Sequence, residues 1–272
     1  MDSETPAEVI CPLCNHPDSW PIKQDPRVHI CQECGFVYVP GEYDAKEVAA
    51  AWTAIYRNKE YDPNWPGVRA RLFYVAEWLD QNLYLRGKNI LDIGAGNGKF
   101  MEFCRDRGAH CVGLEPDKWN HDYIRSKDFF CFHGAVEDFH NVGEFDIVTI
   151  NWTLENCADF KSMLRFANGA LHSKGILSVA TGSRILVPYK KPLSSYLAPD
   201  RPAELHRWRW SEDTLTNAGL LAGFRPENEN DYEENDVLLM TFGKPAPPPR
   251  PPIYDDPIEV RDFFEEWGKT FP

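Results

Sequence analysis

The sequence predicts a doubly wound, Rossmann-like α/β domain, a largely parallel sheet with helices on both faces, preceded by a small four-cysteine zinc ribbon. Three observations support this fold class. Apolar runs at residues 89–93, 110–115 and 145–150 alternate with segments of helical periodicity. A glycine-rich turn follows the first run. Two CxxC pairs lie near the N-terminus.

The turn after the first predicted strand carries three glycines, Gly94, Gly96 and Gly98. Glycine adopts positive φ without strain and places no Cβ in the way of a ligand, and the helix that begins at Gly98 has free backbone N–H groups. We therefore expect a nucleotide-type ligand to lie across this turn. The third glycine comes one residue too early for a dinucleotide fingerprint, so the spacing disfavours NAD.

Two carboxylates flank this turn in the sequence. Asp92 lies two residues before Gly94, where it would repel a pyrophosphate and attract a cation. Glu115 ends the second predicted strand, 21 residues beyond Gly94, where an acidic side chain accepts hydrogen bonds from ribose hydroxyls. A ligand with both a ribose and a positive charge fits this pair, and S-adenosylmethionine carries an ammonium and a sulfonium.

These motifs resemble those of the class I S-adenosylmethionine-dependent methyltransferases, over about residues 72–244. The segment from Asp92 to Gly98 is similar to their first motif, and Leu114-Glu115-Pro116 is similar to their second. The resemblance implies that the turn holds the methionine half of the cofactor and that Glu115 holds its ribose. It also implies a cofactor-binding set of Asp92, Gly94, Gly96, Gly98, Glu115, Pro116, Ala135, Asn151 and Trp152.

Two members of that set need a separate account. Ala135 stands where the family often has an aspartate that contacts adenine, so contact there would be through backbone amides or a neighbouring side chain. Trp152 follows the fourth predicted strand, and packing on the cofactor and plain core packing are equally compatible with the sequence.

The remaining elements continue the alternation of strand and helix. We expect further strands at residues 129–133, 175–180 and 237–242 and helices at residues 117–127, 159–171 and 211–222. Residues 181–209 show no clear period, which suits an insertion that covers a substrate. The polar segment 227–236 is left unassigned.

The N-terminal cysteines form the pairs Cys11/Cys14 and Cys31/Cys34, with sixteen residues between them. This spacing predicts a tetrahedral Zn²⁺ site, and Asn15 and Gly35 tolerate the left-handed backbone that follows such pairs. Four thiolates leave no open position on the metal, so the zinc is expected to be structural. A disulfide pair is the alternative, disfavoured by a reducing compartment. The other cysteines, expected to be ordinary buried thiols, are Cys104, Cys111, Cys131 and Cys157.

Length and composition suit one α/β domain with a small appendage, at 272 residues and 43% hydrophobic content. The predicted divisions are a ribbon at 1–42, a helical linker or lid at 43–86, the cofactor domain at 87–244, and a Pro-rich linker with a short helix at 245–272. No apolar run approaches a membrane span and no signal peptide is evident, so a cytoplasmic location is expected. The net charge of −13 makes nucleic-acid binding unfavourable.

A zinc ribbon before such a domain is similar to the layout of methyltransferases that modify sugars and glycans, including C-methyltransferases of nucleotide-linked deoxysugars. Glu204 and His206 resemble the Glu/His element of those enzymes, which implies His206 as general base with Glu204 supporting it. The alternative is that His206 binds substrate or caps the next helix. Asn156 stands where those enzymes usually have a histidine, and we expect no counterpart of their further C-terminal domain.

The sequence therefore predicts methyl transfer from S-adenosylmethionine to a sugar, nucleotide-sugar or related small polar acceptor. A phosphate-bearing sugar is one candidate, because Arg201, Arg207 and Arg209 fit a single phosphate. The C-terminal tail could dock back or bind a partner protein. Two alternatives are kept: a ribosomal RNA base methyltransferase, which would be expected to show a basic face, and a non-catalytic binding protein with a degenerate methyltransferase domain.

Overall fold

The computed structural model describes residues 10–57, 65–140, 142–197, 206–244 and 251–271. The chain divides into two compact units. We call Tyr43–Gly182 with Ala218–Arg250 the sheet unit, and Met1–Glu42 with Ser183–Asn217 and Pro251–Pro272 the ribbon unit.

The sheet unit is built on a seven-stranded sheet in the order β10-β11-β8-β7-β4-β5-β6. The strands from β8 to β6 run parallel, while β11 and β10 are antiparallel additions at one edge. The strands are β4 (Asn89–Ile93), β5 (His110–Glu115), β6 (Phe130–His133), β7 (Phe145–Asn151), β8 (Leu171–Thr181), β10 (Arg225–Glu229) and β11 (Leu238–Gly243).

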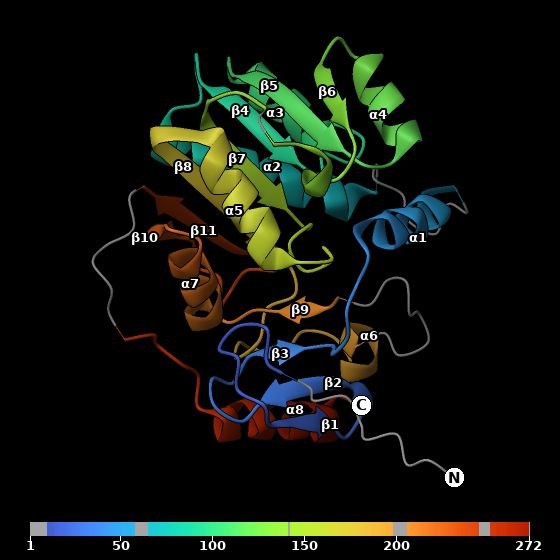
Figure 1. The fold of residues 1–272 in the computed structure, drawn as a ribbon, viewed down its shortest axis with the longest axis vertical. Helices are drawn as coiled ribbons and strands as arrows, with labels where there is room; N and C mark the ends of the chain where they lie inside the picture. Colours follow the sequence, from blue (N-terminus) through green and yellow to red (C-terminus); the bar gives the residue numbers. More distant parts are fainter. Residues whose placement is uncertain (1–9, 58–64, 141, 198–205, 245–250, 272) are drawn as a thin grey trace. The chain divides into compact units, whose positions relative to one another are not determined.

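The strand order reverses direction at β4. The chain moves from β4 through β5 to β6, then returns past β4 to β7 on its other side. Because crossovers between parallel strands are right-handed, this reversal sends the later helices to the opposite face of the sheet. Figure 1 shows α5 over β7 and β8, with α2 and α3 behind the sheet. The helices are α1 (Ala45–Arg57), α2 (Pro66–Leu83), α3 (Lys99–Asp106), α4 (Lys118–Arg125), the 3-10 turn η1 (Val136–Asp138) and α5 (Phe160–Ala170).

Local signals explain where these helices begin. The side chain of Asp117 accepts a hydrogen bond from the backbone N–H of Asn120 and caps α4, and Asp159 caps α5 through Lys161. A core cluster joins α2 and α3 to the sheet and includes Val75, Leu79, Ile90, Phe100 and Leu239. This packing fixes the ends of β4, β5 and β7, where a ligand of such a sheet binds.

The ribbon unit contains a four-stranded antiparallel sheet in the order β1-β2-β3-β9. Its strands are β1 (Ser19–Ile22), β2 (Asp25–Cys31), β3 (Val37–Tyr38) and β9 (Trp208–Arg209), and its helices are α6 (Leu193–Leu197) and α8 (Pro257–Thr270). Helix α7 (Glu212–Leu221) runs across the division between the two units.

The C-terminal helix buries its apolar face within its own unit. Val260, Phe264 and Trp267 of α8 are buried, and Trp267 Nε1 donates to the carbonyl oxygen of Lys191 at 2.8 Å. The tail therefore docks back on the chain, and this apolar face is already covered. The prediction of a partner protein at the tail receives no support from the helix.

The observed elements confirm the predicted α/β class with small differences. The strand β10 extends from Arg225 into the polar segment 227–236, for which the sequence predicts no element, and it pairs with β11. The insertion without clear periodicity contains α6 and the two-residue strand β9. Among the described helices, none combines the length and hydropathy that a segment crossing a membrane needs.

Candidate cofactor-binding site

The glycine turn lies at the carboxyl end of β4, at the point where the strand order reverses. Gly94, Gly96 and Gly98 have φ values of 71°, 55° and 74°, which confirms the predicted positive φ at all three. A Cβ placed on Gly94 would lie 2.3 Å from Thr153 Oγ1, whereas a Cβ on Gly96 would meet nothing within 4 Å. The turn is thus held closely against the loop after β7 at Gly94 and is open at Gly96.

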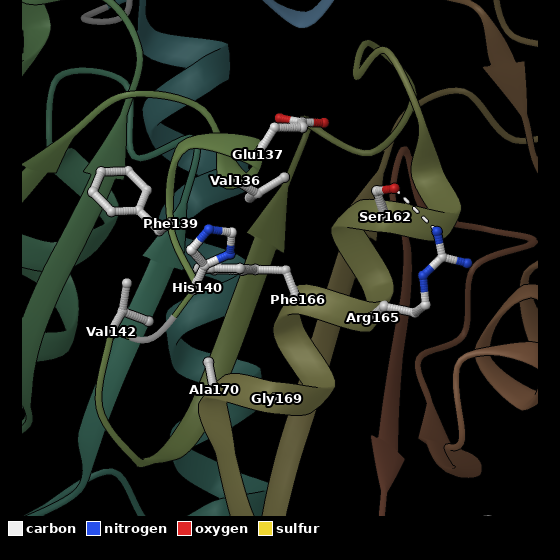
Figure 2. A pocket seen from close by; sticks show the side chains of 10 residues that line it. All are labelled: Val136, Glu137, Phe139, His140, Val142, Ser162, Arg165, Phe166, Gly169 and Ala170. Carbon is white, nitrogen blue, oxygen red and sulfur yellow. Dashed lines mark hydrogen bonds between the residues drawn. The ribbon is translucent and has the colours of Figure 1, made fainter.

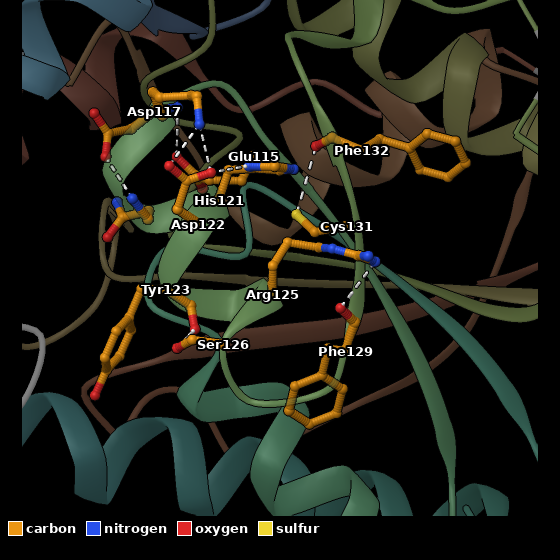
Figure 3. A network of polar contacts seen from close by, with 12 residues as sticks. Glu115, Asp117, His121, Asp122, Tyr123, Arg125, Ser126, Phe129, Cys131 and Phe132 are labelled. Atoms are coloured by element: carbon orange, nitrogen blue, oxygen red, sulfur yellow. Dashed lines mark hydrogen bonds and ion pairs between the residues drawn. The ribbon is translucent and has the colours of Figure 1, made fainter.

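Glu115 directs its carboxylate toward this turn. Its Oε2 accepts the backbone N–H of Gly96 at 2.8 Å, and its Oε1 accepts the backbone N–H of Asp117 at 2.9 Å. Figure 3 shows Glu115 and Asp117 in the polar network that surrounds α4. Burial raises the pKa of Glu115 to about 8, although these two N–H groups favour the ionised form. A ligand that favours the carboxylate would lower this pKa.

Asp92 is buried in β4 and contacts the neighbouring strand. Its Oδ1 accepts hydrogen bonds from Thr149 Oγ1 at 2.7 Å and Asn151 Nδ2 at 3.2 Å. Burial raises its pKa to about 7, because among the described residues no lysine or arginine pairs with it. Asp92 and Glu115 are therefore two buried carboxyl groups near one turn without a cation, which suits a positively charged ligand.

Several buried polar atoms near the turn lack hydrogen-bond partners within the described part of the chain. They are Asn97 Nδ2, both amide atoms of Asn120 and Asn151 Oδ1. Buried polar groups are normally paired, so this group of atoms fits a polar ligand that is held here. Asn97 and Asn120 were not predicted as site residues, since in the sequence they look like ordinary positions at the start of helices.

Trp152 and Ala135 make different contacts in the sheet unit. The Trp152 side chain packs against the core cluster beneath the sheet, which favours the core interpretation of this residue, and its backbone φ is 52°. The backbone N–H of Ala135 donates to Asp138 Oδ2 at 2.9 Å. The carboxylate of Asp138 therefore lies beside the Ala135 backbone, a contact that the sequence does not predict.

The loop after β7 also contains a buried acid, Glu155. Burial raises its pKa to about 7, and neither of its carboxylate oxygens has a hydrogen-bond partner among the described residues. Asn156 follows it and donates from Nδ2 to the carbonyl oxygen of Trp152 at 3.0 Å. This amide holds the loop closed and cannot take up a proton as a histidine would.

A cavity of the sheet unit lies between η1 and α5. Its volume is about 450 Å³, and Figure 2 shows the apolar side chains of Val136, Phe139 and Phe166 beside His140 and Arg165. The glycine turn and Glu115 do not line it. It is therefore distinct from the site at the end of β4.

The four N-terminal cysteines converge in the ribbon unit. Their Sγ atoms all lie within 4.8 Å of one another, with Cys11 and Cys34 at 3.7 Å and Cys14 and Cys31 at 3.5 Å. A tetrahedron of sulfurs around Zn²⁺ has edges of about 3.8 Å. Asn15 and Gly35 have φ values of 66° and 68°, which confirms the predicted left-handed residues. The geometry fits a four-thiolate metal site.

His206 lies in the ribbon unit, and its proposed partner Glu204 lies outside the described residues. The His206 Nδ1 forms a hydrogen bond with Ser183 Oγ. Burial and the nearby Arg209 and Lys191 lower its pKa to about 3. His206 is therefore neutral at physiological pH, but its basicity is low in this state.

The close contact at Gly94 gives a testable prediction. The change Gly94→Ala is expected to destabilise the protein by about 3 kcal/mol, because it adds backbone strain and an overlap with Thr153. Gly87→Ala is the matched control, since Gly87 has a φ of 75° and open space around its Cβ position, and it should cost about 1 kcal/mol. Denaturant unfolding of both variants measures the difference, and equal losses would show that the contact with Thr153 is unimportant.

The fold and this site define a class of α/β proteins that bind a nucleoside-containing cofactor beyond the carboxyl ends of parallel strands. The chain belongs to the family described as the methyltransferase domain, whose sequence model matches residues 47–229. An Aromatoleum aromaticum protein named ubiquinone biosynthesis O-methyltransferase is 34% identical over 91 residues, covering 30% of this chain and 39% of that protein. The protein of the same name from Azorhizobium caulinodans is 30% identical, covering 46% and 53%. The chain spans about half or less of the length of these curated relatives.

Solved structures show the same fold. A 1,6-didemethyltoxoflavin-N1-methyltransferase of Burkholderia thailandensis, with its substrate and S-adenosylhomocysteine bound, has a TM-score of 0.57 and 16% identity, covering 80% of this chain and 99% of that one. An S-adenosylmethionine-dependent methyltransferase of Thermotoga maritima has a TM-score of 0.55 and 18% identity, covering 72% and 99%. These likenesses confirm the predicted Rossmann-like methyltransferase fold.

Proposed function

We propose that this protein is an S-adenosylmethionine-dependent methyltransferase that acts on a small-molecule acceptor. One observation carries the proposal: the open glycine turn lies where the strand order reverses, and the buried carboxylate of Glu115 accepts a backbone N–H from it. Calorimetric titration of the protein with S-adenosylmethionine tests it directly. Saturable binding at micromolar concentrations is expected, and no heat of binding to folded protein would refute the proposal.

The residues of the site have separate tasks in this proposal. Glu115 accepts the ribose hydroxyls, Gly94, Gly96 and Gly98 let the methionine half approach the backbone, and Asp92 contributes negative charge. The adenine ring lies near Pro116 and the Gly134–Ala135 backbone, with Asp138 as a hydrogen-bond acceptor. Asn151 borders the path along which the methyl group passes to the acceptor. S-adenosylmethionine supplies the methyl group as a sulfonium. The protein mainly aligns the acceptor and excludes water.

The buried carboxyl groups predict a pH dependence of cofactor binding. In the free protein Glu115 has a pKa of about 8 and Asp92 of about 7. Because the ionised forms suit the ribose and the sulfonium better, binding should lower both pKa values and release protons. Affinity should therefore rise with pH, by up to about tenfold per unit for one coupled proton, and level off above about pH 8. Calorimetry in buffers of different ionisation enthalpy measures the protons released; zero release at neutral pH would contradict this.

The acceptor has two candidate classes. A sugar or nucleotide-sugar, with a phosphate-bearing sugar as one form, is supported by the ribbon layout and by the cationic side chains near Arg209. A ring hydroxyl is favoured by the names of the curated relatives, which are ubiquinone biosynthesis O-methyltransferases. Release of S-adenosylhomocysteine in the presence of a panel of nucleotide-sugars and of catechol-type phenols distinguishes the classes.

His206 remains our candidate for the general base, with Glu204 supporting it. A base with a pKa of about 3 removes a hydroxyl proton poorly, so this role requires a negatively charged ligand that raises the pKa of His206. The change His206→Ala should leave cofactor affinity unchanged while turnover falls at least about tenfold. Unchanged turnover on an accepted substrate would exclude His206 as the base.

The ribbon unit is proposed to bind one structural Zn²⁺ through Cys11, Cys14, Cys31 and Cys34. Free thiols throughout the described chain suit a reducing compartment such as the cytosol, which we keep as part of the proposal. The acidic net charge of −13 disfavours RNA as the acceptor. Cofactor binding without turnover on any acceptor would favour the non-catalytic alternative.

A further inference from the structure

The guanidinium of Arg209 is a buried cation, and three of its five N–H groups, on Nε and Nη2, have no acceptor among the described residues. Arg209 lies in β9, opposite Val37 of β3, and has no exposed surface. Its Nη1 donates to the carbonyl oxygen of His206 at 2.7 Å. Its Nε and Nη2 are buried and have no hydrogen-bond partner among the residues that the structure describes.

The two unused nitrogens form one recognisable edge. Nε–H and Nη2–H point side by side and match the two oxygens of a carboxylate or a phosphate. Two other arginines of this chain use the same edge to bind a carboxylate. Arg27 donates to both oxygens of Asp25, from Nε to Oδ1 at 2.9 Å and from Nη2 to Oδ2 at 2.8 Å, whereas Arg225 donates from the same two atoms to a single oxygen, Oε1 of Glu227. Arg209 therefore presents an oxyanion-binding edge without an oxyanion.

The surroundings of Arg209 are positively charged and do not neutralise it. Asp25 is the acidic group that acts on it, but both oxygens of Asp25 are already bound by Arg27. The face of the guanidinium lies over the ring of Tyr196, with 5.5 Å between Cζ and the ring centroid. Lys191 adds a second positive charge over the same Tyr196 ring, and burial together with Arg209 and Lys191 keeps the nearby His206 neutral by lowering its pKa. Unpaired buried charges are strongly unfavourable in proteins, so this arrangement points to a negatively charged ligand.

We propose that the Nε/Nη2 edge of Arg209 binds the oxyanion of a small ligand, a carboxylate or a phosphate, with Lys191 contributing positive charge and His206 lying beside the bound anion. The site lies wholly in the ribbon unit, and its occupancy does not depend on methyl transfer in the sheet unit. Because the edge is buried, the anion enters when neighbouring side chains move aside. A bound oxyanion raises the pKa of His206 and thereby increases its basicity.

The first test compares inorganic phosphate and acetate as probes of the zinc-loaded, full-length protein. Each probe is titrated at constant ionic strength while thermal stability is followed. We expect one probe to stabilise the wild type saturably, and the better probe identifies phosphate or carboxylate as the preferred group. In Arg209→Lys, which keeps the charge but loses the paired N–H edge, the midpoint concentration should rise at least about tenfold. Arg225→Lys is the matched control, because the same edge of Arg225 is exposed and bound to Glu227, and it should bind like the wild type.

A second measurement uses only the wild type, in case Arg209→Lys does not fold. The pKa of His206 is followed by NMR of its ring nitrogens, with and without a saturating concentration of the better probe. We expect the anion to raise this pKa by at least about one unit, since a nearby negative charge stabilises imidazolium. Binding that is unchanged in folded Arg209→Lys overturns the proposal. The proposal is also overturned if neither phosphate nor acetate changes the thermal stability of the wild type or the pKa of its His206.

Discussion

The change Glu115→Gln is expected to weaken binding of S-adenosylmethionine about 100-fold, the largest effect of any single substitution in the cofactor site. Both oxygens of Glu115 accept backbone N–H groups, from Gly96 and Asp117. Glutamine has one carbonyl oxygen and one NH₂ group, so one of these N–H groups would face another donor. The side chain also loses the charge that attracts the sulfonium and strengthens hydrogen bonds from the ribose. Together these losses correspond to about 3 kcal/mol.

The experiment is a calorimetric titration above about pH 8, where more than half of Glu115 in the free protein is ionised. Glu144→Gln is the matched control, because Glu144 is an exposed glutamate of the same unit outside the turn. The Glu115 variant should also lose its share of the pH dependence of binding. If Glu115→Gln binds S-adenosylmethionine within about threefold of the wild type, Glu115 is not part of the cofactor site. The control variant shows whether a change in net charge alone affects this affinity.

The parts of the cofactor site that follow from short-range sequence patterns were predictable. The three glycines and Glu115 are fixed by the strand, turn and strand that contain them, and a positive φ at each glycine is a property of the residue type. Asp138 and Thr153 were not predicted. Asp138 reaches back to Ala135 within a 3-10 turn, and Thr153 packs against Gly94 from another strand's loop, so neither relation has a sequence signature.

The cysteine pattern predicted the metal site of the ribbon, but it did not predict which later segments of the chain belong to the ribbon unit. The spacing of the CxxC pairs indicated a metal site, whereas β9 and α8 join the ribbon unit from much later in the chain. A strand of two residues is too short to show alternation, and a short amphipathic helix does not reveal its partner. Burial of Arg209 arises from this long-range assembly. The sequence indicated only that arginines cluster there.

Removal of the zinc is expected to unfold the ribbon unit while the sheet unit still binds cofactor. Binding of structural Zn²⁺ to four thiolates contributes on the order of 10 kcal/mol, more than the stability of many small domains. The cysteine cluster is also tied to the later segments, since a Cβ on Gly35 would lie 2.7 Å from Asp255 Cβ, and Asp255 accepts a hydrogen bond from Ser211 at 2.6 Å. Loss of the metal should therefore release α8 and expose Trp267. The residues proposed to hold S-adenosylmethionine all lie in the other unit.

Cys34→Ser and chelation of the wild type test this expectation with three readouts. Metal analysis should give one zinc per chain for the wild type and a large loss for the variant. Near-ultraviolet circular dichroism should lose the signal of buried tryptophans such as Trp210 and Trp267, while calorimetric affinity for S-adenosylmethionine changes less than about tenfold. Cys157→Ser, a buried cysteine of the sheet unit, is the control and should retain its zinc. A wild type that holds no zinc and keeps its tryptophan signal would show that thiol packing alone maintains the ribbon. A loss of cofactor affinity equal to that of Glu115→Gln would show instead that the two units fold as one.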